Sequence, residues 1–307
     1  MEQEGFTGMQ AGSHSPDGRF AAPLRLEWWL QLEAWRDSLD RCARKASRKR
    51  VHELRIITLR LQAALEFWLS EQPPDAQSAR AAKRWKTQGQ KLRRALRPLR
   101  ETDAYLERLG SLRGPVAGPH GRGPRCSRGC LREMEVFESE LVHRRKAAAD
   151  ALRVEIEERR ERMERRTAAL EKVLESALPG KSGSAAQAAF ALFASLDEQF
   201  KDLNGGNLHA YRKGLKKVRY LAEIATDPES GRLAAICRKM LNAAGDWHDW
   251  QVLANEAQRL LPGKEGGLAA MLATMTEQAL RRALGICQRS RARLLKSGGG
   301  DESSGQR

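Results

Sequence analysis

No part of the 307-residue sequence contains the run of about 18 apolar residues that a membrane-spanning helix requires. The first twenty residues, MEQEGFTGMQAGSHSPDGRF, also lack a basic start followed by an apolar stretch, so no secretory signal is predicted. We therefore expect a cytoplasmic protein with no segment inserted in a membrane.

Cysteine is scarce, and the five residues of this type are widely scattered rather than densely spaced as in a disulfide scaffold. Cys126 and Cys130 form the only close pair, but no second pair and no histidine at ligand spacing completes a zinc site. The sequence thus predicts a reducing compartment, with these two residues as loop thiols, and neither a metal nor a cofactor.

The common signatures of phosphate-processing enzymes are missing. The sequence has no Gly-x-x-x-x-Gly-Lys-Ser/Thr loop, no clustered carboxylates suited to Mg²⁺, and no Ser or Cys nucleophile beside a base. We therefore predict a binding protein with no catalytic residues, and an enzyme is the disfavoured alternative.

Acidic residues are in short supply. The chain has 55 Lys and Arg against 39 Asp and Glu, which gives a formal net charge of +16 and a pI near 10.1. Such an excess favours a polyanionic partner, which could be a nucleic acid, an anionic membrane surface or a phosphate polymer. Composition does not choose among the three.

The β-branched alternation typical of strands is also absent, whereas apolar residues recur at spacings of three and four. The sequence therefore predicts an all-α fold. Gly, Pro and Asn signals end the helices near 72–75, 110–129, 179–180, 204–206, 227–228 and 262–267. We expect a flexible leader at 1–22, a helical domain at 23–296 with a Gly/Pro loop at 110–130, and a disordered tail at 297–307.

Positive charge concentrates in three segments. Residues 41–60 hold one acid, Glu53, among many basic residues, and residues 80–100 and 209–219 hold none. Like charges one helical turn apart destabilise a helix by a few tenths of a kcal/mol per pair, so such clusters indicate a bound anion. A solvated helix face is the competing interpretation, and the missing acids argue against it.

An internal repeat carries two of these segments. VHELRIITLRLQAALE from Val51 and LHAYRKGLKKVRYLAE from Leu208 align without gaps, with His52 on His209 and Arg55 on Arg212. The chain therefore has two related halves, at about 23–178 and 183–296.

Each repeat has the same two faces on a helical wheel. In the second, His209, Arg212, Lys216 and Arg219 fall within about 80°. In the first, the matching basic face consists of Lys45, Arg48, His52 and Arg55. Beside each lies an apolar face: Val51, Leu54, Thr58, Leu61 and Leu65 in the first half; Leu208, Tyr211, Leu215, Val218 and Ala222 in the second. We expect the apolar faces to be buried in bundles and the histidines to ligate an anion with pH-dependent affinity.

The ordered motifs V-H-E-L-R at 51–55, L-R-E-T-D at 99–103, L-H-A-Y-R-x-x-x-K-K-V-R-Y at 208–220 and G-D-W-H-D at 245–249 resemble the CHAD family, the conserved-histidine α-helical domain. The resemblance covers roughly Leu24 to Leu295 and implies two four-helix bundles related by pseudo-two-fold symmetry. It further implies a basic groove or pore that binds inorganic polyphosphate, and a stand-alone, phosin-like protein on polyphosphate granules.

The resemblance implies a polyphosphate-binding set drawn from both halves. We predict this set as Lys45, Arg48, His52, Arg55, Arg60, Arg93, Arg94, Arg97, Arg100, His209, Arg212, Lys213, Lys216, Lys217, Arg219, Arg238 and Lys239. In the first half, Leu59 and Gln62 stand where the family more often has basic residues, so the arginines at 93–100 are expected to compensate. Asp103 and Asp249 are expected to orient basic side chains or to cap helices rather than to bind phosphate, since a carboxylate repels a polyanion.

Binding of RNA or single-stranded DNA is the main alternative. It needs the same positive charge but usually adds aromatic side chains on which bases stack. Aromatic residues make up only 6% of the chain, and most of its seven tryptophans lie among apolar neighbours. This favours polyphosphate, and a polyphosphate-processing enzyme is the least favoured function.

Overall fold

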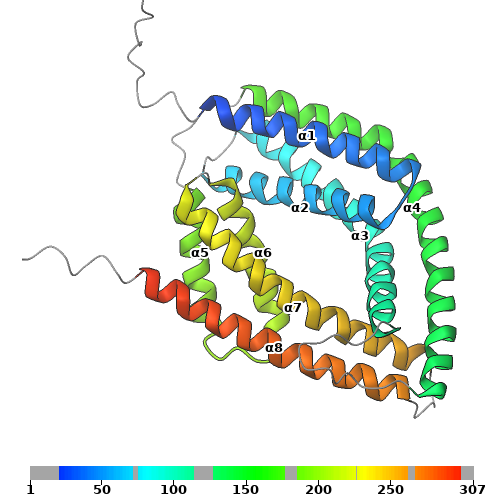
Figure 1. Cartoon of the computed structure of the whole chain (residues 1–307). Helices are drawn as coiled ribbons and strands as arrows, with labels where there is room; N and C mark the ends of the chain where they lie inside the picture. Colours follow the sequence, from blue (N-terminus) through cyan, green and yellow to red (C-terminus); the bar gives the residue numbers. More distant parts are fainter. Residues whose placement is uncertain are drawn as a thin grey trace, which may run out of the picture.

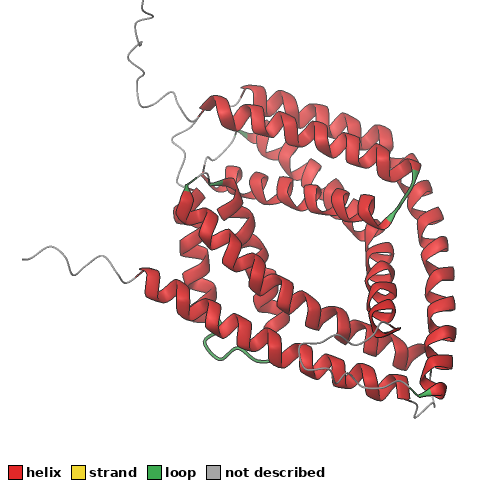
Figure 2. Cartoon of the chain, viewed as in Figure 1, coloured by secondary structure: helices red, strands yellow, loops and turns green. Residues whose placement is uncertain are grey.

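The computed structural model describes residues 21–71, 75–113, 127–176, 185–225, 227–261 and 267–298. Within these ranges the regular structure is helical (Figures 1 and 2), as predicted. The helices are α1 (Ala21–Arg44), α2 (Arg48–Glu71), α3 (Ala76–Arg113), α4 (Arg128–Ser176), α5 (Ala185–Gln199), α6 (Leu208–Ile224), α7 (Pro228–Leu260) and α8 (Gly267–Gly298). Most of the predicted leader and tail lies outside the described residues. Within the described residues, no helix is long and apolar enough to cross a membrane.

The first bundle joins α1, α2 and α3 to the C-terminal part of α4. Trp35 and Trp85 meet edge to face at its centre, with ring centroids 5.6 Å apart. Both indoles are buried, and the Trp35 Nε1 donates a hydrogen bond of 3.0 Å to Thr58 Oγ1. Leu152, Ile156, Met163 and Leu170 of α4 complete this core.

The second bundle consists of α5 to α8, but its core also includes residues from the first half. Leu109 near the end of α3 and Phe137 near the start of α4 pack in the same cluster as Trp247 and Trp250. Helix α4 therefore contributes to both cores, and Figure 1 shows it running from α8 at one end to α1 at the other.

Equivalent helices of the two halves pack against each other. The contacts between the halves pair α2 with α6, α3 with α7 and α4 with α8. Pairing of each helix with its own counterpart is the pattern that a two-fold axis produces. The predicted pair of four-helix bundles with internal pseudo-two-fold symmetry is thus confirmed.

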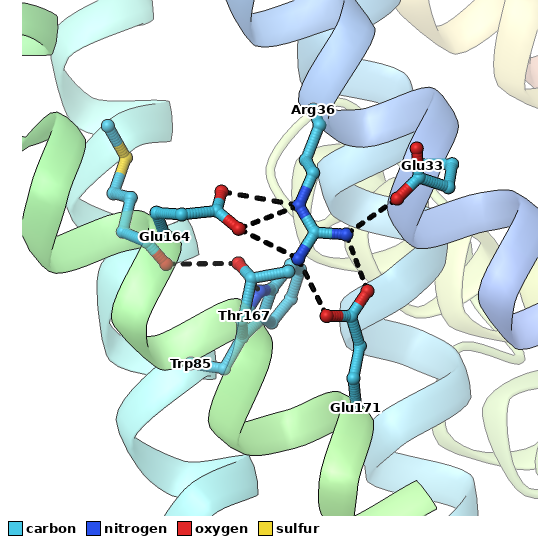
Figure 3. A network of polar contacts seen from close by, with 7 residues as sticks. Glu33, Arg36, Trp85, Glu164, Thr167 and Glu171 are labelled. Carbon is cyan, nitrogen blue, oxygen red and sulfur yellow. Dashed lines mark hydrogen bonds and ion pairs between the residues drawn. The ribbon is translucent and has the colours of Figure 1, made fainter. Parts of the chain in front are cut away.

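A partly buried ionic contact joins α1 to α4 (Figure 3). Arg36 donates to Glu171 Oε2 at 2.6 Å and lies 2.9 Å from Glu164, while Glu33 of its own helix lies 2.7 Å away. Thr167, on the same stretch of α4, accepts a hydrogen bond of 3.2 Å from Trp85 of α3. This stretch of α4 thus directs its acids toward α1 while its Thr167 contacts α3.

The start of α7 follows the expected signal, whereas α3 and α4 extend beyond theirs. Asp227 caps α7 by accepting a hydrogen bond of 2.8 Å from Ser230 N, with Pro228 as the first helical residue. Helix α3 continues to Arg113 and α4 begins at Arg128, so both extend a few residues into the predicted loop.

Two details differ from the sequence expectations. Cys130 is not a loop thiol, because it is buried in the first turn of α4 and disulfide-bonded, whereas Cys42, Cys237 and Cys287 are free. Its neighbour Cys126 lies outside the described residues. Lys45 does not share the basic face of α2, because the chain turns at 45–47 and the helix begins at Arg48.

Candidate functional site

The two repeat helices, α2 and α6, bury the apolar faces expected of them. Every predicted member of these faces is at most 1% exposed: Val51, Leu54, Thr58, Leu61 and Leu65 on α2; Leu208, Tyr211, Leu215, Val218 and Ala222 on α6. Their burial fixes the rotation of both helices, so the adjacent basic faces point away from the cores. Because α2 packs on α6, these faces meet between the halves.

Lys216 of α6 lies where basic residues from both halves converge. Burial, followed by repulsion from Arg212, Arg55, Arg100 and Arg219 in that order, lowers the pKa of its ammonium group to about 7. These arginines come from α6, α2 and α3. One site thus draws cations from both bundles.

Arg55 of α2 has the same surroundings. Its pKa is lowered first by burial, then by Arg100, Arg93 and Arg212, while Tyr220 opposes the change. The pKa of Arg93 is also lowered, chiefly by burial. We call the residues linked by these mutual interactions the central basic cluster: His52, Arg55, Arg93, Arg100, His209, Arg212, Lys216 and Arg219.

Half of the central basic cluster has no counter-ion. Among the described residues, no carboxylate lies within 4.0 Å of Arg55, Arg93, Arg212 or Lys216. The Nε atoms of Arg93 and Arg212 are buried, and the described part of the chain offers them no hydrogen-bond partner. A buried charge of this kind costs several kcal/mol unless an anion pairs with it. An anion placed among these side chains would remove that cost.

The histidines of the cluster are neutral in the free protein at pH 7. Burial and then Arg100, Arg55 and Arg48 lower the pKa of His52, although Glu53 acts in the opposite direction. Burial, Lys213, Arg212 and Lys216 lower the pKa of His209. A bound phosphate favours the protonated imidazole, so anion binding and protonation are coupled.

His248 of α7 belongs to this site, although it was absent from the predicted set. Its ring centroid lies 4.8 Å from that of His209, and the Nδ1 atoms of both are buried without a partner in the described structure. Burial, Arg212 and His209 lower the pKa of His248 to about 4, and Asp249 opposes this shift. The sequence signal for His248 was the G-D-W-H-D motif at 245–249, of which only Asp249 was assigned a role in the sequence analysis.

The acids near the site hold arginines, as expected for Asp103 and Asp249. Asp249 lies 3.5 Å from Arg100 and 3.9 Å from Arg108, and Asp103 accepts a hydrogen bond of 2.6 Å from Arg145. Asp249 thereby joins α7 to α3 across the two halves. These carboxylates orient cations at the edge of the site.

The other nine predicted residues lie outside the central basic cluster. Arg48, Arg60, Arg97 and Arg238 are exposed and pair with acids, namely Glu107, Glu223, Glu101 and Glu223. Lys45, Arg94, Lys213, Lys217 and Lys239 are exposed and form no ion pair within the described ranges. Only Lys213 and Arg48 among these nine act on a histidine of the cluster.

The tryptophans are mostly unavailable for stacking on bases. Trp35, Trp85, Trp247 and Trp250 are buried in the two cores, whereas Trp29 is 52% exposed.

In the part of the chain that the structure describes, no group of three or more His, Cys, Asp or Glu side chains is placed to hold a metal ion.

Comparison with known proteins agrees with this architecture. The family model of the CHAD domain matches residues 28–258. The fold is similar to that of PptA from Streptomyces chartreusis, at 16% identity and a TM-score of 0.64 over 89% of this chain and 99% of that one. It is also similar to the CHAD domain from the plant Ricinus communis, at 18% identity and a TM-score of 0.59 over 92% and 95%. No curated protein matches the chain.

Proposed function

Because this chain belongs to the CHAD domain family, which is associated with polyphosphate binding in general, we propose that it binds inorganic polyphosphate in the central basic cluster. The observation that carries the proposal is the group of partly buried cations without counter-ions, drawn from both halves. A linear anion lying between α2 and α6 would reach all of them.

Polyphosphate suits this site on electrostatic grounds. Each unit of the polymer carries about one negative charge, so several units bind several cations and release their counter-ions. Guanidinium groups add paired hydrogen bonds to phosphate oxygens. Affinity would then depend on chain length and fall steeply with salt, without a sequence requirement.

We infer that the chain acts by binding and not by catalysis, since the sequence has no nucleotide-phosphate loop and no activated nucleophile. A cytoplasmic protein with this site would associate with polyphosphate granules. RNA or single-stranded DNA could use the same charges, but four buried tryptophans leave little aromatic surface for bases.

Calorimetric titration of the purified protein with long-chain polyphosphate, single-stranded RNA and orthophosphate tests this function. The central variant, Arg212→Gln, Lys216→Gln and Arg219→Gln, removes three charges from the cluster. The scattered variant, Lys146→Gln, Arg232→Gln and Arg289→Gln, removes three exposed charges that form no ion pair among the described residues.

We expect tight, length-dependent binding of polyphosphate that the central variant loses and the scattered variant keeps. Equal or tighter binding of RNA, or equal losses in the two variants, would contradict the proposal. Release of orthophosphate from polyphosphate during the titration would show instead that the protein is an enzyme.

A further inference from the structure

A second group of arginines without counter-ions lies where α3 packs on α4. Arg166 of α4 donates a hydrogen bond of 3.2 Å from Nη1 to the carbonyl oxygen of Arg84 in α3. Burial, and then repulsion from Arg84, Arg162 and Arg165, lowers the pKa of Arg166. We call Arg84, Arg162 and Arg166 the outer arginine cluster.

This cluster is on a different side of α3 from the central basic cluster. Arg84 precedes Arg93 by nine residues, which turns a helix by about 180°. Arg100 shares the direction of Arg93, whereas Lys91 shares that of Arg84 to within about 20°. Two separate basic faces therefore run along α3.

The outer arginines differ from their neighbours along α4 in lacking acids. Six other arginines between positions 144 and 166 pair with carboxylates: Arg144, Arg145, Arg153, Arg159, Arg160 and Arg165. Within the described residues, Arg162 and Arg166 form no ion pair, even though Glu158 precedes Arg162 by one turn. The nearby acids Glu164 and Glu171 instead hold Arg36 of α1 (Figure 3).

The partner face of α3 is equally free of acids. Arg80, Lys83, Arg84 and Lys91 are exposed and have no carboxylate within 4.0 Å in the described ranges. A solubilising surface would intersperse acids, as the rest of α4 does. Basic side chains without ion pairs thus stand on both helices around the contact between Arg84 and Arg166.

We propose that the outer arginine cluster is a second contact site for linear phosphate polymer, so that one protein molecule bridges two polymer strands. This inference rests on the proposed function of the central basic cluster. Three arginines provide bidentate phosphate contacts but few charges, so the outer contact is weak and salt-sensitive by itself. Once the central site holds one strand, many protein molecules on that strand together capture another by multivalency. Such bridging would condense polyphosphate into a granule.

A two-strand capture experiment tests the bridge. Biotinylated long-chain polyphosphate on beads is saturated with the full-length protein and washed, and fluorescent polyphosphate of the same length is then added. The protein on the beads reports the first strand, and the bead fluorescence reports the second. The outer variant, Arg84→Gln, Arg162→Gln and Arg166→Gln, should keep bead binding within about twofold and lose about tenfold of the captured fluorescence.

Two controls separate bridging from net charge and from misfolding. The scattered variant, with the same loss of charge, should capture the second strand as well as the wild type does. A conservative variant with Lys at positions 84, 162 and 166 retains the charge and should keep most of the capture. Circular dichroism confirms that each variant remains helical.

The outcomes distinguish the two proposals. If the wild type does not bind the beads, the proposed function fails and the bridge fails with it. If the wild type binds the beads but captures no second strand, the bridge alone is wrong. Capture that survives in the outer variant, or is lost equally in the scattered variant, also refutes the outer site.

Discussion

Replacing Lys216 with methionine should stabilise the free protein while weakening its binding of polyphosphate. The ammonium group is buried among arginines of three helices, which lowers its pKa from 10.5 to about 7. At about 1.4 kcal/mol per unit, its surroundings oppose the charged form by about 5 kcal/mol. Counter-ions near the site offset part of this, so we expect Lys216→Met to raise the free energy of unfolding by about 2 kcal/mol at pH 6.5.

The sign of the pH dependence follows from proton binding. Between pH 7 and 10.5 the unfolded chain keeps its proton on Lys216 while the folded chain loses it, so wild-type stability rises with pH over this window. The penalty is complete below about pH 7 and disappears near pH 10.5. The advantage of Lys216→Met should therefore shrink as the pH increases from 6.5 to 9.5.

Calorimetric melting at the two pH values, without polyphosphate, measures this effect. Lys217→Met is the matched control, because Lys217 is exposed on the same helix. Polyphosphate should raise the melting temperature of the wild type more than that of Lys216→Met. A destabilised Lys216→Met protein, or a gain in stability that does not vary with pH, would show that Lys216 is an ordinary structural residue and refute the reasoning.

Three further predictions concern binding and packing. Polyphosphate affinity should fall as the pH rises from 6 to 9, because binding favours protonated Lys216, His52 and His209, whose pKa values are lowered in the free protein. Calorimetric titrations in buffers of different ionisation enthalpy should show that the protein takes up protons when polyphosphate binds. With about six cations engaged, the logarithm of affinity should fall with the logarithm of salt concentration with a slope of about −4, and a slope near zero would exclude counter-ion release. A Cβ on Gly214 would overlap Leu196 Cδ1, so Gly214→Ala should destabilise the second bundle by about 2 kcal/mol in a urea melt. Gly110→Ala meets nothing within 4 Å and should stabilise α3 by about 0.5–1 kcal/mol.

Helical periodicity was enough to predict the orientation of α2 and α6. The apolar faces that begin at Val51 and Leu208 are buried as expected, because an amphipathic helix packs with its apolar side toward the core. Their burial also decides which cations can meet, so Arg55 and Arg212 could be assigned together from the repeat alone. The local sequence was therefore enough to predict how the two helices that form the site are rotated.

Contacts between distant segments were not predictable in the same way. Helix α4 is rich in charged residues of both signs, yet it supplies Phe137 to one core and Ile156 to the other. No local pattern specifies that Arg145 will meet Asp103 on α3, or that His248 will lie against His209. These pairings depend on how the halves dock, which sequence spacing does not encode.

The two halves contribute positive charge to the site through different residues. Where α6 carries Arg219, α2 carries Gln62, which is buried and donates a hydrogen bond of 2.9 Å to the carbonyl oxygen of Lys86. A Cβ on Gly89 would lie 2.9 Å from the Gln62 amide nitrogen, so the close packing of α2 on α3 leaves Gln62 no freedom to face an anion.

Helix α3 replaces the missing cations of the first half, but only in part as predicted. Arg93 and Arg100 lie in the central basic cluster, whereas Arg94 and Arg97 are exposed and lie outside it. Positions 93 and 100 are seven residues apart and share a face of α3, whereas Arg94 is turned by about 100° from Arg93. Arg97 lies one turn after Arg93 but is exposed and pairs with Glu101. Loss of Arg93 should therefore weaken polyphosphate binding as strongly as loss of Arg219, whereas Arg94→Gln should not. The reason is that α3 supplies basic side chains to the site in the first half, and α6 supplies them in the second. Parallel titrations of Arg93→Gln, Arg94→Gln and Arg219→Gln measure this equivalence, and equal losses for Arg93→Gln and Arg94→Gln would contradict it.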